Sequence, residues 1–143
     1  MKLRDLNEDD SHIFKRWFQN DSIGRRFLAE YENIESLLKL INSSRKFWLA
    51  YNNENYIGFL DLEVDKENGY FSFYVAPNFR NKGLSTELLS LLEKKAHEYS
   101  IKKLFGHVEM ENTNSIRSLQ KAGYLHAQKL DKDNLLKFSK KLA

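Results

Sequence analysis

The sequence predicts an α/β (α+β) fold: a mixed, mostly antiparallel twisted sheet of about seven strands with about four helices. Segments of β-rich or alternating composition interleave with segments of helical periodicity in the order β-α-α-β-β-β-α-β-α-β-β. No repeat, low-complexity tract or linker-like stretch interrupts this order. Residues 1–143 are therefore expected to form a single domain.

The composition excludes several classes of protein. Hydrophobic residues make up 41% of the chain against a net charge of +3, which is typical of a folded chain and not of a disordered one. The absence of cysteine excludes disulfides, thiolate metal sites and a cysteine nucleophile. No apolar run has the length of a membrane span, and the first ten residues, "MKLRDLNEDD", are mostly charged or polar. The sequence thus predicts a cytoplasmic protein with no membrane partner.

The N-terminal third predicts one strand and two helices. Residues 1–6, "MKLRDL", indicate an edge strand, and residues 7–19 place apolar side chains at helical spacing behind Asn7 as a cap. A second helix is expected over residues 33–43, capped by Asn33, with an apolar stripe of Ile34, Leu37, Leu38 and Ile41.

The middle of the chain predicts an antiparallel meander that leads into a βαβ unit. Two β-rich runs within residues 46–64 flank the turn "NNEN", and a third run follows at residues 70–76. A helix over residues 84–99 connects this strand to one at 102–109, so the two strands should be parallel, with a right-handed crossover. The apolar stripe of that helix is Leu84, Leu88, Leu91, Leu92, Ala96 and Tyr99.

The C-terminal part predicts one short helix and two strands. The helix covers residues 112–123 and ends at Gly123, a residue suited to a left-handed stop. The strands are expected at 124–130 and 134–142.

The turn between the third meander strand and its helix, "APNFRNKGLST", has the chemistry of an anion site. Pro77 cannot donate to a strand ladder, and Gly83 permits a backbone conformation or a close approach that a side chain would block. The helix then begins with unpaired N–H groups from about Lys82 to Thr86, next to the cationic Arg80. These residues are equally compatible with an ordinary strand-to-helix turn.

Two segments resemble a known family. "VAPNFRNKGLS", residues 75–85, is similar to the acyl-coenzyme A signature R/Q-x-x-G-x-G/A of the GNAT N-acetyltransferases, which follows a strand ending in V-x-P. "NTNSIRSLQKAGY", residues 112–124, resembles the later segment N-x-x-[SA]-x-x-x-[YL]-x-K-x-G-[FY]. The element order is also that of the family, so the resemblance covers nearly the whole chain. Ser115 and Leu119 make the segment most similar to the ribosomal-protein-N-terminal-acetyltransferase-like branch.

The resemblance implies a GNAT fold whose central parallel strands splay apart to take acetyl-coenzyme A as cosubstrate, with no metal. The end of the first parallel strand would hydrogen-bond the thioester and pantetheine, and the turn with the helix start would hold the pyrophosphate. Ser85 stands where Gly or Ala is usual in the family. The cofactor residues so implied are Phe73, Tyr74, Val75, Arg80, Asn81, Lys82, Gly83, Leu84, Ser85, Thr86, Asn112 and Ser115.

Acetyl transfer to an amine requires a base, because a free lysine amine has a pKa of about 10.4 and is protonated at neutral pH. His107 and Glu109 share one face of a predicted strand, and Glu63 lies on another strand. By resemblance, His107 falls where some members carry a catalytic glutamate. A packing histidine and exposed sheet-face acids are the alternative interpretations. Leu119 stands where many members have a tyrosine that protonates the leaving thiolate.

The sequence therefore predicts an acetyl-coenzyme A-dependent N-acetyltransferase that acts on a primary amine, either a protein N-terminus or a small molecule. The alternative is a weak or inactive coenzyme A-binding or regulatory module of the same fold. Basic and acidic residues are interspersed along the chain, so no nucleic-acid partner is expected. The expected state is a monomer or a homodimer.

Overall fold

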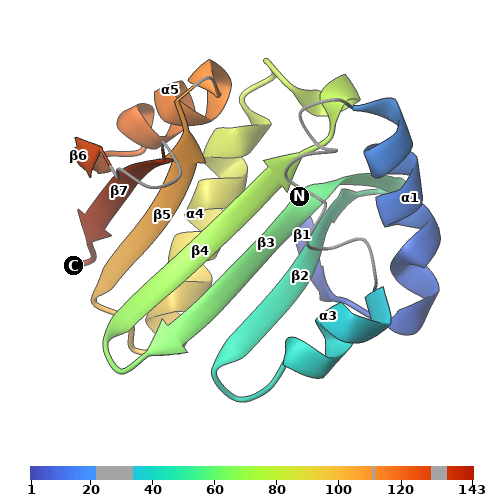
Figure 1. The fold of residues 1–143 in the computed structure, drawn as a ribbon, viewed down its shortest axis with the longest axis horizontal. Helices are drawn as coiled ribbons and strands as arrows, with labels where there is room; N and C mark the ends of the chain where they lie inside the picture. Colours follow the sequence, from blue (N-terminus) through green and yellow to red (C-terminus); the bar gives the residue numbers. More distant parts are fainter. Residues whose placement is uncertain (22–33, 111, 130–134) are drawn as a thin grey trace.

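The computed structural model describes residues 1–21, 34–110, 112–129 and 135–143. They form a seven-stranded sheet in the order β1-β2-β3-β4-β5-β7-β6 (Figure 1). All neighbouring strands are antiparallel except β4 and β5, so the predicted mixed sheet is confirmed. The strands are β1 Lys2–Asp5, β2 Arg45–Asn52, β3 Asn55–Asp65, β4 Asn68–Val75, β5 Lys103–Glu109, β6 Leu125–Lys129 and β7 Leu135–Lys141.

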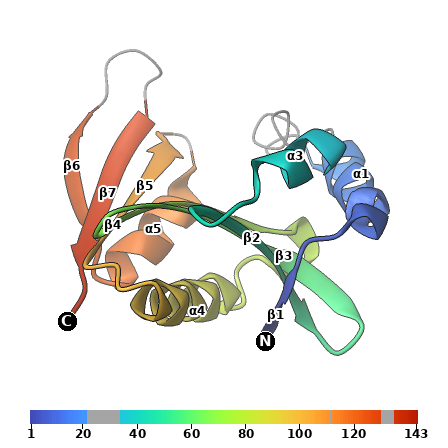
Figure 2. The ribbon, with the colours of Figure 1, turned by 90° about the horizontal axis from the view of Figure 1, so that it is seen from below.

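Helices cover both faces of this sheet. Figure 2 shows α4 and α5 on one side and α1 and α3 on the other. None of the helices in the described ranges is long and apolar enough to cross a lipid bilayer. The helices are α1 Ser11–Asn20, α3 Ile34–Leu40, α4 Leu84–Glu98 and α5 Thr113–Lys121, with 3-10 turns at η1 Glu8–Asp10 and η3 Pro77–Phe79.

Each face of the sheet has its own apolar core. The α4 side buries leucines of β3 and α4, whereas the α1 side packs Phe14 and Trp17 against Phe59. The predicted stripe of α4 is buried at Leu88, Leu92 and Ala96. Leu89 falls outside that stripe and is also fully buried in the same core.

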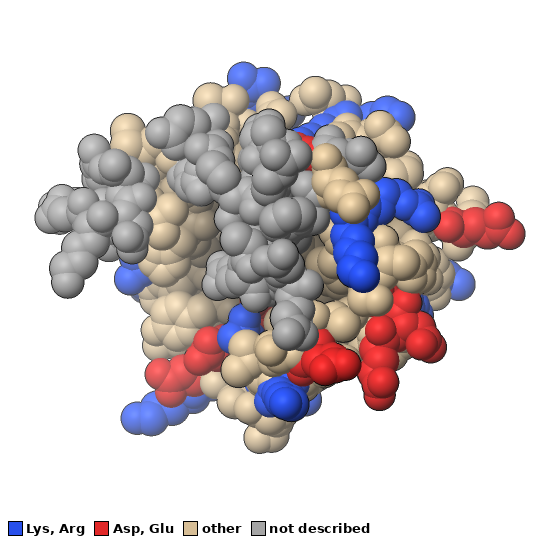
Figure 3. All heavy atoms as spheres, turned by 45° about the vertical axis from the view of Figure 1, so that its right-hand side comes forward, with Lys and Arg blue, Asp and Glu red and all other residues tan. Residues whose placement is uncertain are grey.

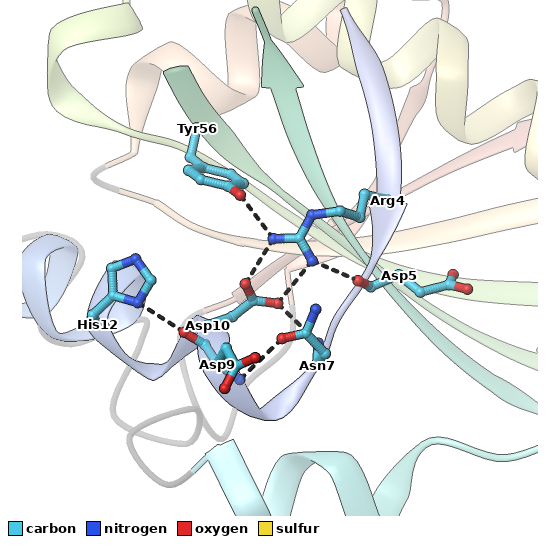
Figure 4. A network of polar contacts seen from close by, with 7 residues as sticks. All are labelled: Arg4, Asp5, Asn7, Asp9, Asp10, His12 and Tyr56. Carbon is cyan, nitrogen blue, oxygen red and sulfur yellow. Dashed lines mark hydrogen bonds and ion pairs between the residues drawn. The ribbon is translucent and has the colours of Figure 1, made fainter. Parts of the chain in front are cut away.

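The N-terminal segment is held by a polar network (Figure 4). Asn7 caps η1 rather than the main helix, and α1 starts after this turn, later than predicted. Arg4 of β1 donates to buried Asp10 at 2.6 Å and to the hydroxyl of Tyr56 in β3 at 2.9 Å. Pairing offsets part of the cost of burying the Asp10 charge and connects β1 to the start of α1.

The second helix, α3, is shorter than predicted. It buries Ile34 and Leu37 of the predicted stripe, and its predicted cap, Asn33, lies outside the described residues.

The parallel strands β4 and β5 diverge before they end. Their pairing runs only from Asn68 opposite Lys103 to Phe71 opposite Gly106, although β4 continues to Val75. The splay implied by the family resemblance is therefore present. It divides β4 into a paired half, Asn68–Phe71, and an open half, residues 72–75, whose edge on the β5 side pairs with no strand among the described residues.

Candidate active site

A cavity of about 310 Å³ lies at the open half of β4, between the start of α4 and one side of α5. All of the predicted cofactor residues line it except Lys82 and Leu84. Leu84 packs against the core, and the Lys82 ammonium lies 6.0 Å from the ring of Phe79. The lining residues are Phe73, Tyr74, Val75, Arg80, Asn81, Gly83, Ser85, Thr86, Asn112, Asn114, Ser115, Arg117, Ser118 and Lys121.

The open half of β4 presents backbone donors to this cavity. The N–H of Ala76 donates to the carbonyl of Ile57 at 2.7 Å, toward β3. Because backbone groups alternate in direction along a strand, the N–H groups of Phe73 and Val75 are directed to the opposite side, where β5 has diverged. An extended ligand in the splay can pair with these groups as a strand would.

Arg80 braces the end of β4 against the end of α1. Its Nε donates to the Val75 carbonyl at 2.9 Å, and its Nη2 donates to Asp21 Oδ2 at 2.6 Å. Asp21 is buried and also accepts from the Tyr74 hydroxyl at 2.8 Å. Burial and this hydrogen bond raise the pKa of Tyr74, so its phenol stays a donor. Asp21 was not predicted from the sequence, since an isolated acid after a helix has no distinguishing spacing.

Gly83 starts the anion-binding wall of the cavity. It is the N-cap of α4 with φ of +77°, in the left-handed region that favours glycine, and it makes no side-chain hydrogen bond to the helix start. A Cβ placed on Gly83 would meet nothing within 4 Å, so the space beyond it is open. The first N–H groups of α4 and the positive end of its dipole are therefore available to an anion.

The opposite wall comes from α5. Asn112 caps this helix, with its Oδ1 accepting from the backbone N–H of Ser115 at 3.2 Å, which leaves the amide NH₂ of Asn112 able to donate. The lining residues Asn114, Arg117, Ser118 and Lys121 were not predicted. Their i, i+3, i+4, i+7 spacing is visible in the sequence as a polar stripe opposite the apolar side of the helix.

His107 lies immediately beyond Gly106, the last residue of β5 that pairs with β4. Its side chain is exposed, and it is opposite Lys137 of β7. Partial loss of hydration, and then the Lys137 ammonium, lower the pKa of His107 below its ordinary value of 6.5. His107 does not line the cavity described above.

The two candidate acids differ in position. Glu63 is exposed on β3 beside Tyr70, which belongs to the paired half of β4. The strand neighbour on its face, Asp61, is buried and paired with Arg45 at 2.8 Å. Glu109 belongs to β5 two residues beyond His107, but its side chain lies outside the described part of the structure.

Leu119 belongs to the buried face of α5, where it is fully enclosed in the core, and it does not line the cavity. Within the described residues, no group of three His, Asp or Glu side chains is placed to hold a metal ion.

A parallel strand pair that opens toward a helix N-terminus, with strand donors in the gap, is the arrangement that the family resemblance implies. A sequence profile of the Acetyltransferase (GNAT) family matches residues 5–124, and the chain belongs to this family. It is therefore an acyltransferase with acetyl-coenzyme A as cosubstrate.

Two curated relatives agree with this assignment. The chain is 24% identical over 134 residues to the uncharacterised N-acetyltransferase YfmK of Bacillus subtilis, covering 92% of this chain and 90% of YfmK. It is also 24% identical over 123 residues to the acetyltransferase PseH of Campylobacter jejuni, covering 81% and 77% of the two chains.

Solved structures share the fold. C. jejuni PseH in complex with acetyl-coenzyme A has a TM-score of 0.74 and 22% identity, with 99% of each chain covered. A spermidine N-acetyltransferase from Vibrio cholerae, in complex with coenzyme A and spermine, has a TM-score of 0.79 and 18% identity, covering 98% of this chain and 94% of that one.

Proposed function

We propose that this protein transfers the acetyl group of acetyl-coenzyme A directly to a primary amine. The observation that carries the proposal is the cavity at the splay, whose walls offer open strand donors, a helix N-terminus and, among the described lining residues, no acidic side chain. Coenzyme A is an extended chain of amides joined to phosphates. Its pantetheine arm fits the edge of an open strand, and its pyrophosphate fits the N-terminus of α4.

In this placement the thioester lies at the end of β4. The N–H of Val75 donates to the thioester oxygen, and a fixed donor of this kind stabilises the developing oxyanion by about 3 kcal/mol. Arg80 holds the Val75 carbonyl at 2.9 Å and so fixes the orientation of the strand end. Asn112 donates to the pantetheine amides from the α5 side.

His107 is the preferred base, with Glu109 and then Glu63 as the other candidates. The ammonium of the acceptor first loses one proton to solvent, and the neutral amine nitrogen then attacks the thioester carbon and forms a C–N bond. Its second proton passes to the neutral imidazole, directly or through water. The C–S bond then breaks, and the thiolate takes a proton from the imidazolium or from water. A lowered pKa keeps His107 neutral at neutral pH, which is the form that accepts a proton.

We further propose a small molecule with a primary amine as the acceptor. The similar V. cholerae enzyme was solved with spermine, a small amine. A protein N-terminus, the acceptor of the ribosomal-protein-like branch, is the other candidate. The test is to incubate the protein with acetyl-coenzyme A and panels of polyamines, other small amines and short peptides, and to follow free thiol release. Release only with peptides would overturn the small-molecule acceptor, and no release with any amine would overturn the transferase.

The alternative function is a coenzyme A-binding module without transfer. It is favoured by the burial of Leu119, because no phenol occupies that position to protonate the thiolate. Such a module would bind coenzyme A in calorimetry but release no thiol above the rate of spontaneous hydrolysis.

The placement of the pyrophosphate can be tested apart from catalysis. Thr86→Glu puts an acid in the first turn of α4, where it stabilises a helix but repels a phosphate. Coenzyme A affinity should fall about tenfold or more with the melting temperature unchanged or raised. Ser90→Glu, on an exposed position of the same helix outside the cavity, is the matched control. Equal affinity in both variants would overturn the placement.

A nucleic-acid partner is not part of the proposal. Figure 3 shows Lys and Arg side chains intermixed with Asp and Glu on the face drawn, and neither sign covers the described surface there. Nucleic-acid binding usually requires basic side chains gathered on one face.

A further inference from the structure

The cavity contains more positive charge than a pyrophosphate at α4 would use. Among the residues that the structure describes, its lining includes three cations, Arg80, Arg117 and Lys121, and no Asp or Glu. The Arg80 guanidinium is bonded to Asp21 and to the Val75 carbonyl. Arg117 and Lys121 are exposed, and no carboxylate lies within 4.0 Å of their charged groups in the part of the chain that the structure describes.

These two cations lie on the wall that faces the start of α4. They are four residues apart on α5, so they lie on one side of that helix with Asn114 and Ser118, while Ile116 and Leu119 pack toward the core. Two like charges at this spacing repel each other weakly, and an anion bound between them removes that cost. The two walls thus offer two separate places for negative charge.

We propose that Arg117 and Lys121 bind the 3′-phosphate of coenzyme A, and that they make the protein selective for coenzyme A over 3′-dephospho-coenzyme A. The inference rests on the proposed placement of the cofactor in this cavity. Coenzyme A carries two anionic groups on one ribose, the pyrophosphate at one position and the monophosphate at another. With the pyrophosphate on the N–H groups of α4, the monophosphate is free to reach the cations of α5.

A purely structural role makes a different prediction. Lys121 is in the last turn of α5, where a cation stabilises the helix dipole, and Arg117 could simply keep an exposed face soluble. In that case neutral variants would change the melting temperature slightly and would bind the two ligands with the wild-type ratio of affinities.

The experiment is calorimetric titration of coenzyme A and of 3′-dephospho-coenzyme A into three proteins. They are the wild type, Arg117→Gln/Lys121→Gln, and the control Lys15→Gln/Lys94→Gln, which removes the same charge from exposed helix positions outside the cavity. Because charge pairs that are partly exposed are of moderate strength, we expect the wild type to bind coenzyme A about tenfold more tightly than 3′-dephospho-coenzyme A. The Arg117→Gln/Lys121→Gln protein, called the α5 variant below, should bind both ligands equally, with about the wild-type affinity for the dephospho form. The control should keep the preference for coenzyme A.

Three outcomes overturn the inference. The wild type could bind both ligands equally, the α5 variant could keep the wild-type preference, or the control could lose the preference as the α5 variant does, which would indicate only a long-range charge effect. If the wild type bound neither ligand, the proposed cofactor placement itself would be wrong, and thiol release with acetyl-coenzyme A would then distinguish failure of this cavity from failure of the proposed function. Raising the salt concentration should weaken coenzyme A binding more in the wild type than in the α5 variant.

Discussion

The two halves of β4 use the same strand backbone for opposite purposes. In the paired half, the backbone groups on the β5 side join the parallel ladder, and Tyr70 stacks on Phe105 with ring centroids 5.2 Å apart. In the open half, the same edge pairs with no strand in the part of the chain that the structure describes, and the Arg80–Asp21–Tyr74 network holds the strand end instead. A sheet can therefore expose backbone donors to a ligand where side chains replace the missing neighbour as the support.

The largest effect should come from the first β5 residue beyond the paired half. His107→Ala should lower kcat/KM by about 10²–10⁴-fold without weakening coenzyme A binding, because a positioned base contributes in that range. The matched control is Lys103→Ala, on the same face of β5 within its paired stretch, which should keep wild-type activity. Retention of more than about a third of kcat/KM in His107→Ala would transfer the role to Glu109 or Glu63.

The pH profile tests the same residue. The pKa of His107 is lowered from 6.5, so the neutral base should persist below that pH, and kcat/KM should fall only as the pH drops through the lowered value. The acid limb should disappear or move in His107→Ala. An unmoved acid limb would show that another group titrates.

Removing the support of the open half should cost both stability and cofactor affinity. Asp21→Asn leaves Arg80 without its carboxylate and should reduce the free energy of unfolding by about 3 kcal/mol, since a half-buried guanidinium loses its partner. Asp61→Asn is a close control, because Asp61 is buried like Asp21 and pairs with an arginine at 2.8 Å, but its partner Arg45 does not line the cavity, whereas Arg80 does. Urea melts should show similar losses in both variants, whereas coenzyme A affinity should fall only in Asp21→Asn. Equal affinities would mean that the network supports the fold alone.

A tyrosine in place of Leu119, on the buried face of α5, should not raise the catalytic rate. Leu119 is fully buried, so Leu119→Tyr should destabilise the protein by about 1–3 kcal/mol through overpacking. A large rise in kcat without loss of stability would show instead that thiolate protonation limits kcat in the wild type. It would also show that the hydroxyl of the introduced tyrosine can reach the open half of β4.

The smallest effect is expected at the cap of α5. Asn112→Asp keeps an oxygen that accepts from the N–H of Ser115 but removes the amide donor of a residue that lines the cavity. Coenzyme A affinity should fall about tenfold while the melting temperature stays within about a degree or two of the wild type. A loss of stability with unchanged affinity would make Asn112 a structural cap only.

Local periodicity determined much of this protein from the sequence alone. The apolar stripe of α4 and the β-rich runs depend on neighbours a few residues apart, and so do Gly83 and Gly123, whose φ values of +77° and +89° suit glycine. The element order and the turn between β4 and α4 that forms part of the site follow from these short-range signals. The polar stripe of α5 was also present in the sequence, but nothing local showed that it would face a cavity.

Tertiary structure alone decided the long-range pairings. β7 lies between β5 and β6, which no spacing in the sequence indicates, and Asp21 reaches Arg80 across 59 positions of the chain. Only the docking of α5 beside α4 turns Arg117 and Lys121 into a cavity wall. The physical reason is that periodic burial specifies which face of an element is apolar, whereas the partner of that face and the ion pairs at its rim are set by the packing of all the elements together.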